Sequence, residues 1–281
     1  MRITRIAAIL LIGVSLALVA CASPMPTPTN SHLNIHFIDV GQGDSVILRY
    51  GSSSMIIDAG TNASTNSLIN TIKGMGISKF DIVVGTHPHE DHIGGMDAVI
   101  NQFDIGTIYM PKVTTTTKTF QDVLIAIKNK GLTITTPETE TIFNFGETQC
   151  TILAPNSQTY EDLNNYSIII KLVYGNTSFL LTGDAQTESE KEMLSNGYNL
   201  QSDVLKVGHH GSSSSTSPEF LKAVSPQYSI ISVGKNNDYG HPHQVTLDKL
   251  AGAGVKVYRT DLNGTITIIS DGSDLSVSTM R

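Results

Sequence analysis

The amino-acid sequence predicts a mixed fold of strands and helices, of the α/β or α+β class. Short runs of aliphatic and β-branched residues, bounded by Gly, Asn and Ser, recur along the chain and are typical of strands. Between many of these runs, apolar residues recur at the spacing of helical turns, which is typical of amphipathic helices. With 281 residues, of which 40% are hydrophobic and 15% charged, the chain can bury one sizeable core or two small ones.

Residues 1–20 are predicted to form a signal peptide. Arg2 and Arg5 precede an apolar run that ends at Ala20 and is short for a membrane span. The run leads into Leu-Val-Ala-Cys21, which resembles the lipobox of bacterial lipoproteins, so we expect cleavage before Cys21 and lipidation of that cysteine. An ordinary signal peptide, or a short anchor with an incidental cysteine, is the alternative.

Residues 21–33 are predicted to be the lipidated cysteine and a flexible linker, because Pro, Thr and Ser dominate after Cys21 and no apolar period is present. The protein is therefore expected to be exported and anchored to the outer face of the bacterial cell membrane. The formal net charge is −7, and it becomes −9 without residues 1–20, which hold two arginines and no acidic residue. Such a charge argues against a broad electrostatic surface for nucleic acid.

One folded domain is expected over residues 34–281. Strands are expected where the β-branched runs lie, at 34–40, 44–50, 53–58, 81–86, 150–154, 167–174, 177–183, 203–207, 227–233, 255–260 and 264–270. Helices are expected where the spacing is helical, at about 65–76, 93–102, 117–130, 186–196, 217–224 and 244–252.

A weak internal repeat predicts that the domain has two similar halves. Residues 45–60 and 167–185 share a layout in which a hairpin ends in an aspartate. Each is followed by an aliphatic strand that runs into a histidine, His87 in one half and His209 in the other. We expect the two halves to bring these strand ends to one seam; hairpins that merely look alike are the alternative.

The placement of the histidines is the strongest signal in the chain. Of nine histidines, seven fall in three clusters, at 87–92, 209–210 and 241–243. The segment Thr86-His-Pro-His-Glu-Asp-His92 follows an expected strand and opens an expected helix, so its side chains should converge in a loop at a sheet edge. Imidazoles and carboxylates suit Zn²⁺, Mn²⁺ or Fe, and the lack of nearby cysteines disfavours a closed structural zinc site. The sequence therefore predicts an open, catalytic metal site.

The pattern H-x-H-x-D-H after a strand resembles the metallo-β-lactamase superfamily, and further segments resemble the hydrolase domain of the ComEC competence proteins. Those segments are Phe37–Ser45, Ile56–Gly60, Leu180–Asp184, Leu205–Ser212 and Tyr239–His243. The resemblance covers roughly residues 34–269. It implies an α+β fold, the four-layer αββα metallo-β-lactamase sandwich, with metal ions at the edge between two sheets.

The resemblance also implies one or two divalent metal ions, with Zn²⁺ expected and Mn²⁺ as the alternative. His87 and His89 would hold the first ion, Asp91 and His92 the second, and Asp184 would bridge the two. The expected metal ligands are thus His87, His89, Asp91, His92, Asp184 and His209.

Asp58, Asn165 and His210 are expected beside the metal ligands. His209 would complete the second site, and the adjacent His210 is the alternative ligand or a residue that touches substrate or core. Asp58 would orient the metal loop, although a polar cap at a strand end is the alternative. Many members of the superfamily add a histidine from the middle of the chain, where this chain has Asn164–Ser167, so Asn165 or water would complete the first site.

The function that the resemblance implies is a phosphodiesterase or nuclease acting on extracellular DNA through a metal-bound hydroxide. Asp91 and His241 are the candidate catalytic residues, with His241 as an acid or phosphate donor unless Gly-His-Pro is only a surface turn. The expected partners are a phosphodiester substrate and, through the lipid, the membrane; no protein partner is predicted. A lactone, thioester or β-lactam hydrolase and a non-catalytic binding module are the alternatives, and the sequence leaves the oligomeric state open.

Overall fold

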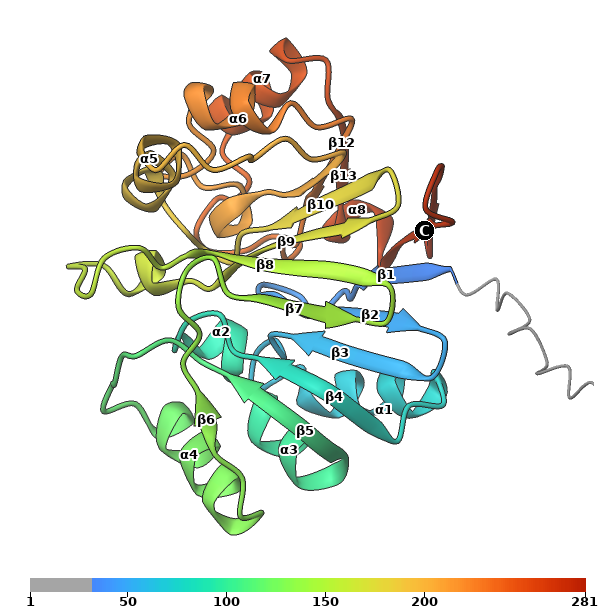
Figure 1. The fold of residues 1–281 in the computed structure, drawn as a ribbon, viewed down its shortest axis with the longest axis vertical. Helices are drawn as coiled ribbons and strands as arrows, with labels where there is room; N and C mark the ends of the chain where they lie inside the picture. Colours follow the sequence, from blue (N-terminus) through green and yellow to red (C-terminus); the bar gives the residue numbers. More distant parts are fainter. Residues whose placement is uncertain (1–31) are drawn as a thin grey trace, which may run out of the picture.

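The computed structural model describes residues 32–281, so the expected signal peptide, Cys21 and most of the expected linker lie outside the described residues. Helices flank the strands on two sides, with α1, α3 and α4 below them and α5, α6 and α7 above them in Figure 1. No helix in the described part of the chain is long and apolar enough to cross a membrane.

Two mixed sheets form the centre of the fold. The first has eight strands in the order β15-β14-β1-β2-β3-β4-β5-β6. Their bounds are β1 (Leu33–Phe37), β2 (Val46–Tyr50), β3 (Ser53–Ile57), β4 (Lys79–Val84), β5 (Asp104–Tyr109), β6 (Ile134–Thr135), β14 (Ile266–Ser270) and β15 (Leu275–Thr279). The second has seven strands in the order β13-β12-β11-β10-β9-β8-β7. Their bounds are β7 (Ile142–Phe145), β8 (Thr148–Ala154), β9 (Ile169–Tyr174), β10 (Thr177–Leu181), β11 (Val204–Lys206), β12 (Tyr228–Ile231) and β13 (Lys256–Arg259).

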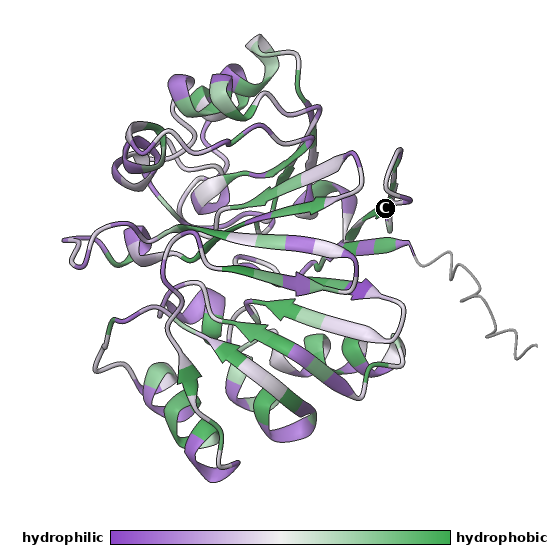
Figure 2. Ribbon diagram, viewed as in Figure 1, coloured by the Kyte–Doolittle hydropathy of each residue, from purple (hydrophilic) through white to green (hydrophobic). Residues whose placement is uncertain are grey.

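The helices follow the amphipathic stretches of the sequence, with two short additions. They are α1 (Thr65–Gly74), α2 (Glu90–Ile93), α3 (Met96–Gln102), α4 (Lys118–Asn129), α5 (Thr187–Ser195), α6 (Pro218–Val224), α7 (Gln244–Gly252) and α8 (Thr260–Asn263). Two 3-10 turns, η1 (Leu163–Tyr166) and η2 (Gly208–Gly211), complete the set. The strands are mostly apolar, whereas the helices carry both apolar and hydrophilic residues (Figure 2).

Three apolar cores separate four layers. The central core joins the inner faces of the two sheets, for example Phe37 of β1 and Phe179 of β10. A second core packs helices on the first sheet, with Leu68 of α1 near Phe80 of β4 in one cluster, and a third packs Phe220 of α6 on the second sheet. Each sheet is therefore covered by the other sheet on one face and by helices on the other, which confirms the predicted α+β, αββα sandwich.

The two halves expected from the repeat are present as two sheets with the same local order. In the first, β2 pairs antiparallel with β3, which pairs parallel with β4. In the second, β9 pairs antiparallel with β10, which pairs parallel with β11. The parallel strands β3 and β4, like β10 and β11, end at the same edge of their sheet.

Four strands were not predicted from the sequence: β5, β6, β7 and β15. Gly106 interrupts the apolar run of β5, and its backbone lies so close to β4 that a Cβ would meet the carbonyl oxygen of Asp81 at 2.4 Å. β15 reads Leu-Ser-Val-Ser-Thr and is a largely exposed strand at the edge of its sheet. Tertiary pairing, rather than a local apolar run, makes these segments strands.

Candidate metal centre

Loops from both sheets meet at one seam, and each begins where a strand ends. β3 and β4 of the first sheet lead into Asp58 and into the segment Thr86–His92. β10 and β11 of the second sheet lead into Asp184 and into the η2 turn. The predicted convergence of the two halves is what brings these side chains together.

Four of these side chains form a cluster that can hold a metal ion. One ligand atom each from Asp91, His92, Asp184 and His210 lies within 4.8 Å of every other. Asp184 Oδ2 is 3.2 Å from His92 Nε2 and 3.3 Å from His210 Nε2, and Asp91 Oδ2 is 3.2 Å from His210 Nε2. His92, Asp184 and His210 are almost completely buried, while Asp91 is partly exposed.

The orientation of the two imidazoles fits metal ligands. His92 Nδ1 donates to Asp58 Oδ2 at 2.7 Å, and His210 Nδ1 donates to the carbonyl oxygen of Ser232 at 2.9 Å. Both rings therefore direct Nε2 toward the carboxylates, as metal-binding imidazoles do. Within residues 32–281, the buried atoms His92 Nε2 and Asp184 Oδ1 have no hydrogen-bond partner. An intermediate-hardness divalent ion such as Zn²⁺ or Mn²⁺ would satisfy this donor set.

The charges of the cluster also fit a site for a metal ion. Burial opposes protonation of His92 and His210, but the neighbouring carboxylates outweigh it and raise the pKa of both imidazoles well above the ordinary value. Burial would likewise raise the pKa of Asp184, yet the imidazoles of His210 and His92 hold it well below its usual range. Without a metal ion, protons on the imidazoles balance the buried carboxylates, and a divalent cation can take their place.

His210, and not His209, belongs to this cluster. His209 Nε2 is 3.9 Å from Asp184 Oδ2 and 3.5 Å from the side-chain nitrogen Nδ2 of Asn164, and the ring remains partly exposed. The two histidines have φ values of 47° and 52°, so both lie in the left-handed region. This turn directs the first side chain toward the cavity wall and the second into the cluster, which sequence distance from the strand end does not reveal.

The metal loop is held in place by Asp58. Its backbone has a φ of 61°, and its side chain is 1% exposed. Asp58 accepts hydrogen bonds from the Thr86 amide at 2.8 Å and the Thr86 hydroxyl at 2.7 Å, besides that from His92. A contact of this kind fixes the ring of a metal-binding histidine.

His87 and His89 lie beside the cluster as a pair. His87 Nε2 is 3.0 Å from His89 Nδ1, and His87 Nδ1 faces the hydroxyls of Thr86 and Ser167 at 3.2 and 3.3 Å. Burial lowers the pKa of His87 well below its ordinary value, so its ring is neutral at neutral pH. Among the described residues, neither histidine belongs to a group of three or more potential metal ligands.

Asn164, rather than Asn165, lines the cavity in the segment where many members of the superfamily have a further histidine. The side chain of Asn165 accepts from the Gln186 amide and donates to Glu188 Oε2, so both ends of its amide are used away from the cluster. The hydroxyl of Ser167 is likewise used away from the cluster, because it contacts His87 Nδ1 and accepts a hydrogen bond from the Asp184 amide at 3.0 Å. The segment therefore shapes the loop around Asp184.

The sequence analysis missed Asp44 and Lys206, which lie buried beneath the cluster. Lys206 Nζ contacts Asp44 Oδ2 at 2.5 Å and donates to the carbonyl oxygens of Gly183 and Val207 at 2.9 and 3.2 Å. One ammonium thus joins the three loops that carry Asp44, Asp184 and His210. Although burial would raise the pKa of Asp44, the ammonium and the nearby imidazoles lower it. Asp44 was within a segment that resembles the family, but its burial was the missing signal.

Asp44, Asp58 and His92 form a second group of potential ligands among the described residues, and all three are buried. Lys206 pairs with Asp44, and His92 pairs with Asp58 through its other ring nitrogen. It adjoins the four-residue cluster through the shared residue His92.

A cavity of about 340 Å³ opens onto the cluster. Three residues of the cluster line it, Asp91, Asp184 and His210, together with Gln42, His89, Glu90, Asn164, His209, Tyr239 and His241. Burial lowers the pKa of His241 to about 4, assisted by His209, so this imidazole is neutral at neutral pH. Within residues 32–281, His241 Nδ1 has no hydrogen-bond partner.

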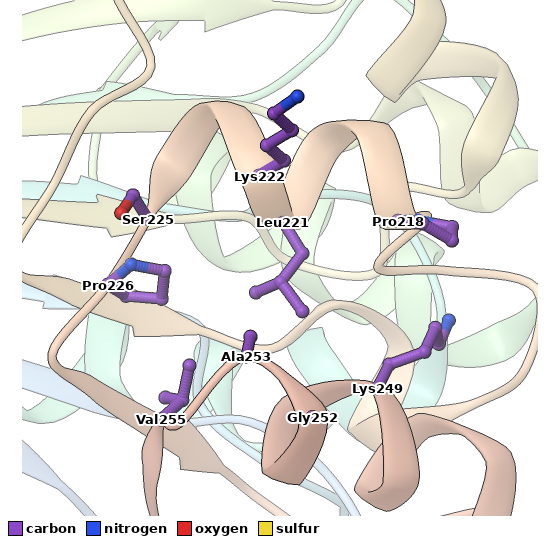
Figure 3. Close-up of a pocket in the computed structure, with 9 residues that line it drawn as sticks. All are labelled: Pro218, Leu221, Lys222, Ser225, Pro226, Lys249, Gly252, Ala253 and Val255. Carbon is purple, nitrogen blue, oxygen red and sulfur yellow. The ribbon is translucent and has the colours of Figure 1, made fainter.

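A separate cavity of about 410 Å³ lies between α6 and α7 (Figure 3). Leu221, Pro226 and Val255 give it an apolar floor, and Lys222 and Lys249 flank it. Of the nine residues that line it in the described chain, none is a histidine or carboxylate, and none lines the cavity at the cluster. Lys249 is held by the carbonyl oxygens of Ser215 and Thr216. Of these two cavities, the one at the seam is therefore the one lined by potential metal ligands.

His210→Ala is expected to weaken metal binding by at least about a hundredfold, because it removes a buried Nε2 from the cluster. His209→Ala is the matched control and should change the dissociation constant by no more than a few-fold, since its ring lies outside the cluster. Isothermal titration with Zn²⁺ or Mn²⁺ measures both constants. The opposite ranking of the two variants would contradict the ligand set read from the structure.

Metal binding is expected to release protons, with an affinity that rises with pH. In the metal-free protein, His92 and His210 hold protons at neutral pH because their pKa values are raised. A metal ion must displace these protons from Nε2, so raising the pH removes the competitor and strengthens binding by about tenfold per pH unit for each proton displaced. Titration heats in two buffers of different ionisation enthalpy count the protons. Heats that do not depend on the buffer would refute this; His209→Ala should leave the count unchanged.

Comparisons with known proteins agree with the geometry. The family profile described as "Metallo-beta-lactamase superfamily" matches residues 38–235. ComE operon protein 3 of Bacillus subtilis is 33% identical over 255 residues, which cover 84% of this chain and 33% of that protein. Competence protein ComA of Neisseria gonorrhoeae is 31% identical over 242 residues, which cover 81% of this chain and 31% of that protein. The chain thus spans about a third of the length of these curated relatives.

Solved structures show the same architecture at low sequence identity. The metallo-beta-lactamase fold protein YhfI of Bacillus subtilis has a TM-score of 0.54 and 13% identity, covering 81% of this chain and 96% of that chain. Tm1679, described as a metal-dependent hydrolase of the beta-lactamase superfamily, has a TM-score of 0.54 and 14% identity, with the same coverage of 81% and 96%. These likenesses support the fold.

Proposed function

Because the chain belongs to the metallo-beta-lactamase superfamily, we propose that it is a metal-dependent phosphodiesterase that cleaves DNA outside the cell. The observation that carries this proposal is the cluster of Asp91, His92, Asp184 and His210 at the base of an open cavity. A divalent cation bound there supplies Lewis-acid chemistry, which polarises a phosphoryl oxygen and increases the acidity of water.

The side chains around the cavity divide the remaining work. Asp91 is partly exposed to the cavity, and although burial would raise its pKa, His92 and His210 lower it, so it is ionised. An ionised Asp91 can accept a proton from an attacking water at its carboxylate oxygen. His241 is neutral, so it donates one N–H hydrogen bond to a phosphate oxygen instead of delivering a proton as an imidazolium. Of the two roles expected for His241, acid and hydrogen-bond donor to phosphate, we therefore propose the second.

The charge of the molecule favours a substrate that is recognised locally. A formal net charge of −7 disfavours long-range attraction of a polyanion, so the metal site has to supply the local attraction for phosphate. One curated relative is named competence protein ComA, and since competence is the ability to take up DNA, this name favours DNA among phosphodiesters.

The proposed location is the outer face of the cell membrane, with Cys21 lipidated. Both Cys21 and the apolar run before it lie outside the described residues. Cys21→Ser is expected to release the protein from the membrane fraction and to prevent labelling by a fatty-acid analogue. An unlabelled wild-type protein, or a variant that stays with the membrane, would contradict the anchor.

The deciding experiment compares substrates on one reconstituted preparation. Metal-free protein is loaded with Zn²⁺ or Mn²⁺, and initial rates are measured on bis-p-nitrophenyl phosphate, single-stranded DNA, a lactone, a thioester and a β-lactam. We expect hydrolysis of the phosphodiesters, its loss in chelator, and no hydrolysis by Asp91→Ala purified in parallel, which controls for contaminating nuclease. Hydrolysis of the other substrates without the phosphodiesters would assign the site to the alternative hydrolase class.

A further inference from the structure

Tyr239 lies exposed at the edge of the cavity that holds the metal cluster. Its side chain is 67% exposed, although it lines the same cavity as Asp91, Asp184 and His210. A single exposed aromatic residue is common on protein surfaces and needs no explanation by itself. The position beside the cluster and the way the ring is held distinguish this one.

The ring of Tyr239 stacks on the ring of His241. Their centroids are 5.7 Å apart and their planes differ by 21°. The His241 ring in turn contacts the rings of His209 at 5.4 Å and His210 at 6.3 Å. A continuous series of rings therefore runs from the surface to the metal cluster, with Tyr239 at its outer end.

The loop that presents Tyr239 is fixed by one side chain. Asn237 Oδ1 accepts from the amides of Tyr239 at 3.2 Å and His241 at 3.0 Å. Asn237 Nδ2 donates to the carbonyl oxygens of Gly234 at 2.9 Å and His241 at 2.6 Å. All four hydrogen-bonding positions of the amide are used, so the exposed ring is held in advance of binding and loses little freedom when a ligand stacks on it.

We propose that Tyr239 is a stacking platform for the nucleobase next to the scissile phosphate, so that the substrate is single-stranded nucleic acid. The inference rests on the proposed phosphodiesterase function. One face of the ring is on His241 and the exposed face is free to receive a base, as aromatic rings do in proteins that bind single strands. A base can reach that face only when it is unstacked from a complementary duplex.

The acidic surface makes such a contact useful. Most proteins that hold single strands combine stacking with a basic groove, and a chain with 25 acidic against 18 basic residues lacks that excess of positive charge. Stacking on Tyr239 and binding of phosphate at the cluster together would position one nucleotide without a basic groove.

The kinetic test compares three variants on two single-stranded oligonucleotides. One is intact, and the other, called abasic, lacks the base at each position beside the cleaved phosphate. Tyr239→Ala should raise KM for the intact oligonucleotide by about tenfold or more, with a smaller change in kcat. On the abasic oligonucleotide, the KM of Tyr239→Ala should equal the KM of the wild type. The KM of Tyr239→Phe should stay within about twofold of the wild-type value on both oligonucleotides. Leu262→Ala, which alters a side chain of similar exposure on α8, is the matched control and should change neither constant. Equal effects of Tyr239→Ala on the two oligonucleotides, or none, would overturn the proposal.

A binding test keeps the inference separate from the proposed function. The chain contains no tryptophan, so Tyr239→Trp carries the only indole fluorophore. We expect a single-stranded oligothymidylate to quench its fluorescence, and we expect inorganic phosphate or an abasic oligonucleotide not to do so. Quenching without cleavage by the wild type would refute the phosphodiesterase and support the platform, whereas cleavage without quenching would refute the platform alone.

Discussion

Asp184→Asn is expected to abolish tight metal binding and to lower turnover on a phosphodiester by about 10³-fold or more, because a metal ion in the cluster is worth several kcal/mol to the transition state. Asp184 lies between the two imidazoles, 3.2 Å from His92 Nε2 and 3.3 Å from His210 Nε2, and it is 2% exposed. The amide has the same shape but no charge, so the variant tests the charge of the ligand and leaves packing intact.

The measurements are metal content after dialysis, by elemental analysis, and initial rates on bis-p-nitrophenyl phosphate. Asp203→Asn is the matched control, because Asp203 accepts hydrogen bonds from Ser178 at the opposite end of β11 from the cluster. It should retain the metal content and rate of the wild type. If Asp184→Asn kept stoichiometric metal and more than a tenth of the wild-type rate, the cluster would not be the catalytic metal site.

Lys206→Met is expected to lower the free energy of unfolding by about 3–5 kcal/mol, the cost of breaking a buried ion pair by removing one partner. The substitution leaves the Asp44 carboxylate and the carbonyl oxygens of Gly183 and Val207 buried without the ammonium that joins them. Because these groups lie on the loops of the cluster, metal affinity should fall as well.

Urea unfolding of the metal-free protein measures the stability change, and titration with Mn²⁺ measures the affinity. Lys171→Met is the matched control, since Lys171 is also buried in the second sheet but donates to the single carbonyl oxygen of Asn199 at 2.7 Å. Its cost should stay near the value of one hydrogen bond, about 1–2 kcal/mol. The double variant Lys206→Met/Asp44→Asn should recover part of the lost stability, and a double variant less stable than Lys206→Met alone would show that the charge of Asp44 is not the cause.

Most strands and helices could be predicted from the sequence because they are encoded by residue patterns within each segment. β-branched runs and helical periodicity identified eleven of the fifteen described strands and the six longer helices, and the repeated hairpins indicated two halves. Strands whose apolar run is interrupted by glycine, such as β5, or that are largely polar, such as β15, could not be found in this way. Their pairing depends on neighbours distant in sequence, such as the close approach of Gly106 to Asp81.

The sequence by itself determined which chemistry the chain can support, through histidines and aspartates spaced so that one loop between a strand and a helix presents them together. Only the tertiary structure decided how those groups divide the work. Two successive left-handed residues turn His210 into the cluster and leave His209 at the wall. Lys206 meets Asp44 only because loops from both sheets converge at the seam. Side-chain direction depends on backbone torsion angles, and contacts between loops depend on the packing of whole sheets, so neither can be read from the order of residues.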